Sequence, residues 1–501
     1  MRAKRVVFIV LAVVAWSRAA SAQTTDAPLA RFIADLVAEG ARIDSVASVE
    51  LGDFLIAQQL GGLPTQLNQS IGFQLSTFPF DMGLSTAKPG FVSVPVNYGF
   101  GAPFSVRAGA IGRGKTSVSF NYQNVSYGWL DGIPLKDFQL GFVLRSPAAT
   151  EARFGRDVIH ESMALRIQQS VATFGVVFGA SEHLDIGVGV PMMHIEMEGQ
   201  VQARVFGTVP SLVPRDRVPG IPADVHFFDV YPSTPLQADG CKTSSIDIQG
   251  VTHAPGDVAL FDMVELASRT VTRRCKASGI GDIVGYLGYR LSNSDKNPLA
   301  ITLAARLPTG DADNLIGAGG TRITGNVAWR GQSGRFLPHV AAGYTVGIGE
   351  SSAILNRVTS CTASTPAPPA TRATNCTQVP LPTPLDLKLP AEINFAGGTD
   401  IVFYRRLTVG ADVFGRRIDK LTTFEVSPTT APALLPGDPL VPGPLLQVKG
   451  QGATLLLAVA SAQVALTDRT LIKTNLLVPM GGKGDGLTPR MSFGFGLGVR
   501  Y

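Results

Sequence analysis

The C-terminal residues alternate strictly between two kinds of side chain. Bulky apolar residues occupy the odd positions from Met491 to Tyr501, and glycine, serine or arginine occupies the even positions from Arg490 to Arg500. Successive side chains of a β-strand point to opposite faces, so this pattern gives one apolar face and one polar face. About ten such residues cross a bilayer as a tilted strand. The segment 489–501 therefore predicts a membrane-spanning strand.

The same alternation recurs upstream. Residues 184–190, 299–307, 391–401 and 407–413 each carry mainly aliphatic or aromatic residues on one face and polar residues or glycine on the other. A soluble β-sandwich also shows such alternation, because each of its sheets buries one face. The strand pattern alone therefore leaves both a sandwich and a membrane barrel open.

The lengths of the connections separate these two fold classes. Membrane barrels have short periplasmic turns and long external loops, so their connections alternate in length. A sandwich has no reason to keep that parity. Counted backward from the C-terminus, the short connections are 467–469, 404–406, 331–334, 292–297 and 180–183, and the long ones are 420–450, 350–390, 308–321 and 206–279. The parity predicts an all-β, antiparallel, up-and-down transmembrane barrel.

Thirteen segments have the pattern of a barrel strand. They are 115–127, 136–146, 168–180, 184–205, 280–291, 298–307, 322–330, 336–349, 391–403, 407–419, 451–466, 470–479 and 489–501. Because both ends of a bacterial single-chain barrel lie in the periplasm, the strand number must be even. We therefore expect one more strand within 91–106 and a barrel of fourteen strands over 91–501. Twelve is the alternative if two predicted strands merge or fail.

The first 22 residues have the pattern of a cleaved export signal. Basic residues precede an apolar run at 6–16, and 20–22 fits an A-x-A cleavage site before Gln23. The run is too short to span a bilayer as a helix. The segment holds four basic residues and no acidic one, so without it the formal net charge falls from +5 to +1. The mature chain offers no basic excess that would favour a nucleic-acid partner.

The composition agrees with a chain in a membrane. Hydrophobic residues make up 45% of the sequence and charged residues 16%, yet no stretch after the signal approaches 18 consecutive apolar residues. In hydrocarbon only helices and closed barrels pair all their backbone polar groups. An exported, apolar chain without a membrane helix therefore predicts a barrel in the bacterial outer membrane, surrounded by its lipid.

Residues 23–90 do not have the pattern of barrel strands. Leu29, Phe32, Ile33, Leu36 and Val37 have helical spacing, and the pattern stops at a glycine. A second helical segment is predicted over 51–60. Two short helices before a barrel can fill the lumen as a plug or lie in the periplasm as a loose extension, and the sequence leaves both possibilities open.

The four cysteines fall in pairs within two predicted external loops. An exported protein meets an oxidising compartment, where disulfides form. Four cysteines permit three connectivities, and the loop positions favour pairing within each loop. A metal site is the alternative, but no C-x-x-C spacing supports it. The sequence therefore predicts the structural disulfides Cys241–Cys275 and Cys361–Cys376, with no metal and no cofactor.

Charged residues on the polar faces of the strands are the candidate functional residues. A charge facing lipid at mid-bilayer costs about 2–4 kcal/mol for Arg or Lys, so these side chains are expected to face the lumen. There they can pair with one another or line a water path. No G-x-S-x-G or H-E-x-x-H motif occurs, and catalysis is not expected. The candidates are Asp185, Asp282, Arg290, Arg306, His339, Glu392, Asp400, Asp412, Lys473, Arg490 and Arg500.

Several segments resemble a known family of outer-membrane proteins. Residues 182–191, 279–291 and 305–311, within 160–501, are similar to the family named for the MetA pathway of phenol degradation. This resemblance implies a barrel transporter, and the family name implies passage of aromatic compounds. A more distant likeness, in architecture alone, is to the long-chain fatty acid transporter family. The terminal strand ending at Tyr501 also resembles the signal by which the barrel-assembly machinery binds its substrates.

Two functions follow as hypotheses. The first is passive transport of small solutes, hydrophobic or aromatic ones included, across the outer membrane. It is motivated by the export signal, the polar interior and the absence of a catalytic motif. The second is a surface-interaction, adhesin-like role for the long loops at 206–279 and 350–390, with the barrel as an anchor.

Overall fold

The computed structural model describes most of the strands and two N-terminal helices. The described residues are 29–40, 43–45, 63–78, 80–81, 85–86, 94–95, 99–100, 110–143, 158–208, 226–228, 241–250, 263–292, 294, 297–349, 357–363, 374–380, 388–404, 406–427, 445–467, 469–480 and 485–501. The predicted export signal at 1–22 and the predicted helix at 51–60 lie outside these residues.

The secondary structure consists of short helical elements followed by strands. The helices are η1 (Leu29–Arg31), α2 (Phe32–Gly40) and α4 (Leu63–Ser76). The strands of the large sheet are β6 (Thr116–Leu130), β7 (Ile133–Pro134), β8 (Phe138–Val143), β9 (Val158–Gly179), β10 (Leu184–Thr208), β12 (Cys241–Gly250), β13 (Met263–Ile280), β14 (Val284–Arg290), β15 (Leu299–Arg306), β16 (Thr321–Arg330), β17 (Phe336–Ile348), β20 (Glu392–Tyr404), β21 (Leu407–Ser427), β22 (Leu445–Ala465), β23 (Thr470–Pro479) and β24 (Leu487–Arg500).

Among the described strands, four small antiparallel pairs are not hydrogen-bonded to the large sheet. They are β1 (Ile43–Ser45) with β11 (His226–Phe228), β2 (Phe80–Asp81) with β5 (Gly99–Phe100), β3 (Ser85–Thr86) with β4 (Val94–Pro95), and β18 (Arg357–Ala363) with β19 (Thr374–Pro380).

Twelve strands close into an antiparallel barrel. Each strand pairs with the next in the order β10, β14, β15, β16, β17, β20, β21, β22, β23, β24, β6 and β9, and β9 returns to β10. The seam between the last and first strands of the chain is continuous, with Val499 opposite Val118 and Gly494 opposite Gln123. The predicted all-β barrel is therefore confirmed, at the smaller of the two strand numbers.

The expected fourteen strands are wrong for two reasons. The predicted strand 136–146 corresponds to β8, which pairs with residues 158–163 of β9, while β6 pairs with residues 168–178 of the same strand. β6 and β8 therefore pair one after the other along β9, so together they count as one crossing of the barrel wall. In the predicted segment 91–106, the described strands β4 and β5 each span two residues and pair with β3 and β2 instead of the wall.

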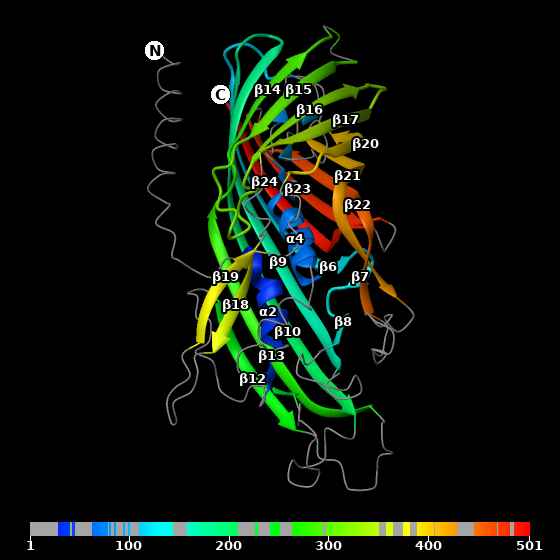
Figure 1. Ribbon diagram of the computed structural model, residues 1–501. Coiled ribbons are helices and arrows are strands. Elements are labelled where there is room, and N and C mark those ends of the chain that lie inside the picture. Colours follow the sequence, from blue (N-terminus) through cyan, green and yellow to red (C-terminus); the bar gives the residue numbers. More distant parts are fainter. Residues whose placement is uncertain are drawn as a thin grey trace, which may run out of the picture.

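The predicted loop 206–279 also contains strand. β13 pairs with residues 192–208 of β10. After a break at 281–283, β14 pairs with residues 184–189 of the same strand. β12 pairs with β13 in turn. Figure 1 shows β9, β10 and β13 extending far beyond the ring, away from the C-terminus. The external side of the barrel therefore carries a long sheet where a loop was expected.

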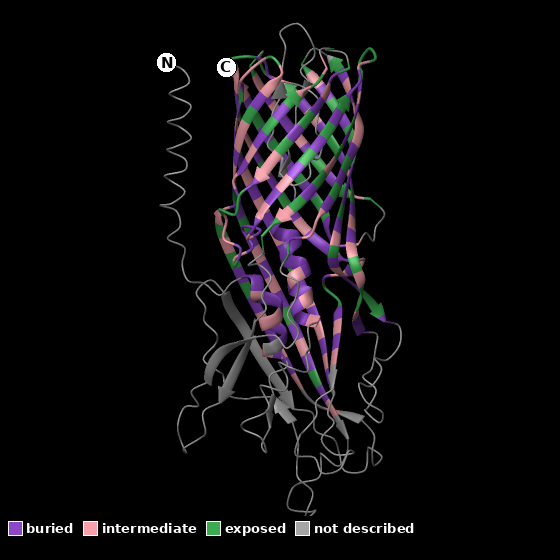
Figure 2. Cartoon of the chain, turned by 45° about the horizontal axis from the view of Figure 1, so that its top comes forward, coloured by how far each residue is buried: buried purple, intermediate pink, exposed green. Residues whose placement is uncertain are grey.

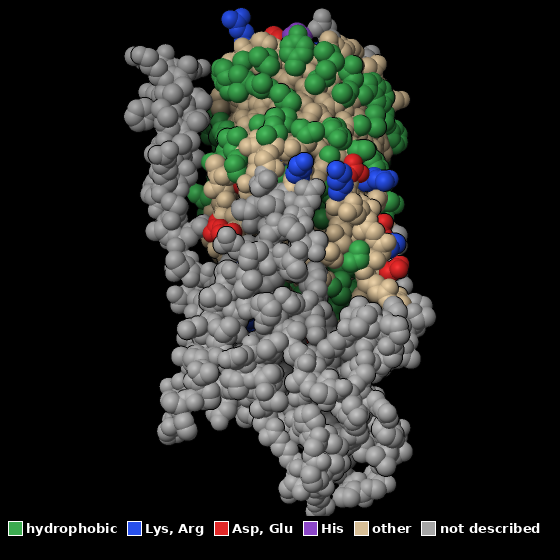
Figure 3. Space-filling view, in the orientation of Figure 1, with side chains coloured by type: hydrophobic (Ala, Val, Ile, Leu, Met, Phe, Trp, Pro, Cys, Tyr) green, Lys and Arg blue, Asp and Glu red, His purple; other side chains and the backbone are tan. Residues whose placement is uncertain are grey.

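Side chains on the wall divide as the alternation predicts. On β15, Ile301 and Leu303 are exposed while Thr302 and Arg306 are buried. On β24, odd positions from Met491 to Leu497 are exposed and the even ones are buried. Figure 2 shows this alternation along the strands of the ring, and Figure 3 shows a band of hydrophobic side chains on the outer face that is in view. Such a band is typical of the lipid-facing surface of a membrane barrel.

None of the helices in the described part of the chain is long and apolar enough to cross a membrane.

We expect the cost of an outward-facing charge to depend on its depth in this band. Replacing Leu303, in the middle of the band, by arginine should lower the free energy of unfolding by about 2–4 kcal/mol, because the guanidinium loses its water. Leu466, beside a short turn at the edge, is the matched control and should cost about 0–1 kcal/mol. Urea unfolding in lipid vesicles, followed by tryptophan fluorescence, measures both. Equal costs would contradict a lipid-facing band.

Candidate functional site

Helix α4 lies inside the barrel. Eleven of its fourteen residues are buried, and its partners come from strands spaced around the ring. Ser70 Oγ donates to the Thr422 carbonyl of β21 (3.0 Å), and Gln74 Oε1 accepts from the Leu487 N–H of β24 (2.6 Å). Figure 1 shows α4 within the ring of strands. The polar side chains of α4 therefore bond to the inner wall on several sides.

The C-terminal end of α4 is held by polar side chains of β9, β15 and β21. Gln169 Nε2 of β9 donates to the Leu75 carbonyl (2.9 Å), and Arg306 of β15 donates to the Ser76 carbonyl. Arg416 Nη2 of β21 donates to Thr77 Oγ1 (2.7 Å). The last carbonyls of a helix lack partners within the helix and carry partial negative charge, so cationic donors suit them.

These arginines belong to a buried ion cluster, here called the arginine cluster: Arg306, Arg322, Arg416, Asp282 and Glu392. Glu392 accepts from Arg416 Nε at 3.1 Å and also pairs with Arg322. Asp282 pairs with Arg306 Nε at 3.1 Å. None of the five side chains is more than 4% exposed. The Arg322 guanidinium lies 5.7 Å from the centre of the Phe73 ring of α4, a cation–π contact.

The connection between β15 and β16 folds into the barrel. Asp282 holds it by accepting from the N–H groups of Gly310 (3.0 Å) and Ala318 (2.8 Å). Leu315 is 1% exposed, and a Cβ added at Gly72 of α4 would lie 3.0 Å from its Cδ2, so helix and loop touch through a glycine. The predicted external loop at 308–321 is thus an inward loop that packs on α4.

Helix α2 is attached both to α4 and to the external sheet. Asn68 of α4 accepts from the Ile33 N–H (3.0 Å) and donates to the Ala30 carbonyl. The apolar face of α2 packs on β10, where Gly199 lets the helix approach closely: a Cβ there would lie 2.3 Å from Leu36. The predicted helical spacing at 29–37 is confirmed, and its apolar stripe faces the sheet.

The polar face of α2 forms ion pairs with β13. Glu39 pairs with Arg269 (2.7 Å), and Asp35 lies 3.9 Å from Arg273 and 3.5 Å from Arg31. Burial raises the pKa of Asp35 from its usual value, against the opposing effect of Arg31 and Arg273. The described part of the N-terminal segment is therefore anchored at both helices, by packing and by charge.

Most of the predicted lumen residues lie on the inner face. His339 Nε2 contacts Asp412 at 2.6 Å, and Asp185 accepts from the Ile111 N–H at 3.1 Å. Arg290 and Arg500 are half-buried near short turns. The residues found buried are Asp185, Asp282, Arg306, His339, Glu392, Asp400, Asp412 and Lys473.

Arg490 is the exception among these predictions. It is exposed, because the pairing of β24 with β6 shifts register on both sides of Pro489, and a bulge turns the side chain out of the strict alternation. A Cβ at Gly128 of β6 would lie 2.6 Å from Arg490 Cγ, so the arginine lies over that glycine.

Sequence reasoning missed several residues that hold the helices. Arg416 stands four residues after Asp412 on the same face of β21, and Arg322 stands two residues before buried Thr324, so strand parity already placed both inside. Arg269 and Arg273 were missed because their segment was taken as a loop. No sequence signal marked Gln169, which is buried between Tyr127 and α4.

The cysteine pairs lie opposite each other in their strands. The register places Cys241 across from Cys275 and Cys361 across from Cys376. This arrangement agrees with the two predicted disulfides, which stay a prediction.

Among the described residues, no group of three or more His, Cys, Asp or Glu side chains is placed to hold a metal ion. Residues 109–116 have phosphate-loop spacing, but Thr116 begins a strand where that motif needs a helix.

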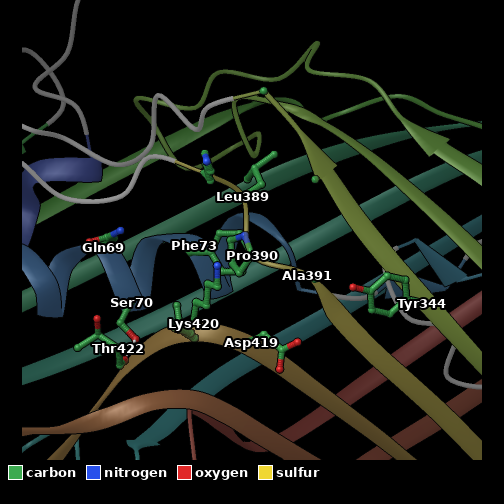
Figure 4. A pocket seen from close by; sticks show the side chains of 14 residues that line it. Gln69, Ser70, Phe73, Tyr344, Leu389, Pro390, Ala391, Asp419, Lys420 and Thr422 are labelled. Carbon is green, nitrogen blue, oxygen red and sulfur yellow. Dashed lines mark hydrogen bonds between the residues drawn. The ribbon is translucent and has the colours of Figure 1, made fainter.

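A cavity of about 640 Å³ separates α4 from one part of the wall. β20 pairs with β17 only as far as Thr345, so residues 346–349 of the β17 end run beside the irregular segment 388–391. The cavity is lined by α4, the end of β17, residues 388–391 and residues 419–422 of β21. Figure 4 shows Phe73 of α4 facing Leu389 and Pro390 across it.

Comparisons with known proteins give weak likenesses. No family model and no curated protein matches the sequence. Solved structures of similar shape include an outer membrane channel from Pseudomonas putida F1 (8% identity, 79% of this chain and 98% of that chain, TM-score 0.37), a Pseudomonas aeruginosa FadL homologue (12%, 78% and 90%, 0.28) and the Pseudomonas putida toluene transporter TodX (10%, 77% and 88%, 0.27). At these scores none identifies a substrate, and the resemblance to the MetA-pathway family stays a prediction.

Removing the carboxylate of Glu392 should destabilise the fold strongly. The substitution Glu392→Gln leaves the buried Arg322 and Arg416 without their shared counter-charge, a change that costs about 3–5 kcal/mol. Glu425→Gln, at an exposed position of the same strand as Arg416, is the control and should change stability by less than about 0.5 kcal/mol. Urea unfolding of refolded protein measures both, and a small effect of Glu392→Gln would contradict the assigned pairing.

Asp131, in the turn after β6, is expected to make stability depend on pH. Asp131 follows β6 at φ 52° and accepts from the N–H groups of Phe424 (2.8 Å) and Gly486. Burial raises the pKa of Asp131 to about 6, although both hydrogen bonds and the nearby Lys449 oppose the shift. A raised pKa stabilises the fold below the unfolded value of 3.8, and that contribution disappears as the pH rises through about 6.

We therefore expect Asp131→Asn to flatten the pH dependence between about pH 4 and 7. The wild type should lose up to roughly 3 kcal/mol of unfolding free energy over this window relative to the variant. Asp137→Asn, at a neighbouring exposed position, is the control and should keep the wild-type slope. Unfolding curves at four or five pH values give the comparison, and a wild-type slope in Asp131→Asn would exclude this carboxyl as the source.

Proposed function

We propose that the chain is an outer-membrane channel for passive passage of small solutes, closed at rest by its own N-terminal helices. The observation that carries this proposal is α4, buried inside a closed ring and bonded to β9, β15, β21 and β24. A closed wall with polar inner residues can enclose a water path. The helix occupies the space that such a path would use.

The outer surface supports residence in the outer-membrane lipid. Exposed large hydrophobic residues occur on every strand of the ring, and Figure 3 shows them as a band on the face in view. The last residue lies at the seam, where Tyr501 N–H donates to the Thr116 carbonyl (2.8 Å). Tyr501 itself is 72% exposed. Recognition of this end by the barrel-assembly machinery, removal of 1–22 and the absence of enzyme activity stay predictions.

The interior supports solutes with an apolar part. Phe73 of α4 and, beside this helix, Leu315 and Leu389 are apolar and buried, whereas the buried polar residues Asn326 and Thr302 lie on the inner faces of β16 and β15. Small hydrophobic or aromatic solutes match the first region and water-soluble ones the second. A solute that passes both regions must be small and must carry both apolar and polar groups.

Single-channel conductance in a planar bilayer tests the proposal. The mature chain from Gln23 should be silent or nearly so, and a version lacking 23–90 should conduct steadily, because the lumen loses α4. A version that keeps 23–90 but lacks 364–373, between β18 and β19, is the control and should stay silent. Equal conductance with and without 23–90 would contradict the plug, and silence of every version would contradict the channel.

The surface-interaction alternative keeps one supporting observation. β9, β10, β12 and β13 build a long external sheet, larger than a pore entrance needs. Shortening β12 and β13 while keeping the ring separates the two roles. Lost cell or ligand binding together with an impermeable barrel would favour the adhesin-like role over transport.

A further inference from the structure

The cavity beside α4 has an apolar floor. Phe73, Leu389 and Leu421 line it and are each at most 6% exposed. Leu389 lies so close to the wall that a Cβ at Gly347 would be 2.2 Å from its Cβ. A volume of about 640 Å³ falls within the range of roughly 300–1,000 Å³ found for small-molecule sites. The floor therefore suits an aromatic ring or a short hydrocarbon chain.

The mouth of the same cavity carries positive charge. Lys388, Asp419 and Lys420 line it. Asp419 already has a cationic neighbour, since its Oδ1 lies 3.8 Å from Arg417 Nε in an exposed pair. Among the described side chains at this place, Lys388, Lys420 and the neighbouring Arg417 are cationic and Asp419 is anionic, so positive charge predominates. An anionic group is the occupant that this charge favours.

The backbone places Lys420 at this mouth. The pairing of β21 with β22 shifts register between Ile418 and Thr422, and Lys420 has φ 55°, a conformation that a lysine seldom adopts. Bulges of this kind redirect a side chain and often adjoin functional sites. In Figure 4 the Lys420 side chain extends toward Pro390 and Phe73, which line the same cavity.

The cavity lies at the outer edge of the hydrophobic band. Tyr344 and Ile348 of β17 are both exposed and belong to the band, whereas Arg417 and Lys420 of β21 lie beyond it. Figure 3 shows charged side chains in a row just outside the band. At this level an occupant can keep a charged end in water while its apolar part is enclosed. Its apolar part would also touch α4 at Ser70 and Phe73.

We infer that this cavity binds a small amphipathic anion, with an aromatic or short aliphatic body packed on Phe73, Leu389 and Leu421 and its anionic group at Lys388 and Lys420. The inference deepens the proposed function and rests on it in one respect, namely that the occupant is a transported solute. Binding itself requires no transport. The solute class is then an aromatic or short-chain carboxylate or sulfonate, in place of a neutral hydrocarbon.

A matched pair of fluorescent probes tests the charge requirement. 8-Anilinonaphthalene-1-sulfonate is N-phenyl-1-naphthylamine with one added sulfonate, so the two probes share an aromatic body and differ in charge. Both are titrated into full-length protein in lipid nanodiscs, with empty nanodiscs subtracted. The double substitution Lys388→Gln with Lys420→Gln should weaken the sulfonate probe about fivefold and leave the neutral probe within about twofold. Added salt should weaken the sulfonate probe alone on the wild type.

Two further variants complete the design. Ala391→Trp fills the cavity and should weaken both probes, and Lys136→Gln, at an exposed lysine elsewhere, should change neither. The inference is overturned if the double substitution leaves the sulfonate probe unchanged, if it weakens both probes equally, or if Ala391→Trp affects neither. The salt titration needs no variant, so misfolding of a variant still leaves a decisive result. Intact sulfonate binding, together with a version lacking 23–90 that does not conduct, would keep the site and remove only the transport role.

Discussion

The structure depends on the closure of its hydrogen-bonded wall. Strands in hydrocarbon must pair every backbone polar group, and only a closed ring does so. Closure at the seam of β24 and β6 fixes the number of strands at twelve. A ring of about eight strands is filled by its own side chains, whereas wider rings leave a lumen. Twelve strands therefore create an interior that water or another part of the chain must occupy, and here α4 and the loop after β15 lie in it.

Electrostatic interactions with the arginine cluster explain why α4, which carries polar side chains, is stable inside the barrel. Burying an ion pair is costly unless its hydrogen bonds are complete. The arginine cluster contains three arginines and two carboxylates, with Arg322 and Arg416 sharing Glu392, so the five side chains together carry one net positive charge. The C-terminal end of α4 carries about half a negative charge and lies against Arg306 and Arg416. The helix thus supplies part of the counter-charge for the wall, and the wall supplies donors for the helix end.

Much of the wall could be predicted from the sequence, because lipid imposes a visible pattern. Where one face meets hydrocarbon and the other meets polar groups, apolar and polar residues alternate, as on β15 and β24. β13 carries Arg269 and Arg273 on its inner face and Arg274 and Lys276 on its outer face. β13 lies beyond the hydrophobic band, so its outer face meets water and its inner face forms ion pairs. Both faces are therefore polar, and the sequence lacks the apolar–polar alternation that would distinguish this strand from a loop.

Helix α4 escaped prediction for a related reason. An amphipathic stripe arises when one side of a helix faces a core and the other faces water. α4 is surrounded by protein and meets polar wall residues on several sides, so Asn68, Ser70 and Gln74 are buried together with Leu67 and Ile71. Its polar residues are spread around the axis because each bonds to a different part of the molecule. Arg490 shows the same limit for strands, since one bulge at Pro489 reverses its face.

The irregular positions of the wall coincide with the parts that can bind or move. β20 stops short of the end of β17, β21 bulges at Lys420, and the cavity lies between these two interruptions and α4. A continuous ladder would have sealed this place with paired backbone and left no room for a ligand. Each interruption gives up ladder hydrogen bonds, and natural sheets retain such losses chiefly where they serve a site. The cavity also shares Phe73 with the arginine cluster through the cation–π contact of Arg322. An occupant of the cavity therefore contacts the same helix that the cluster holds, which joins ligand binding to the position of the plug through a single side chain.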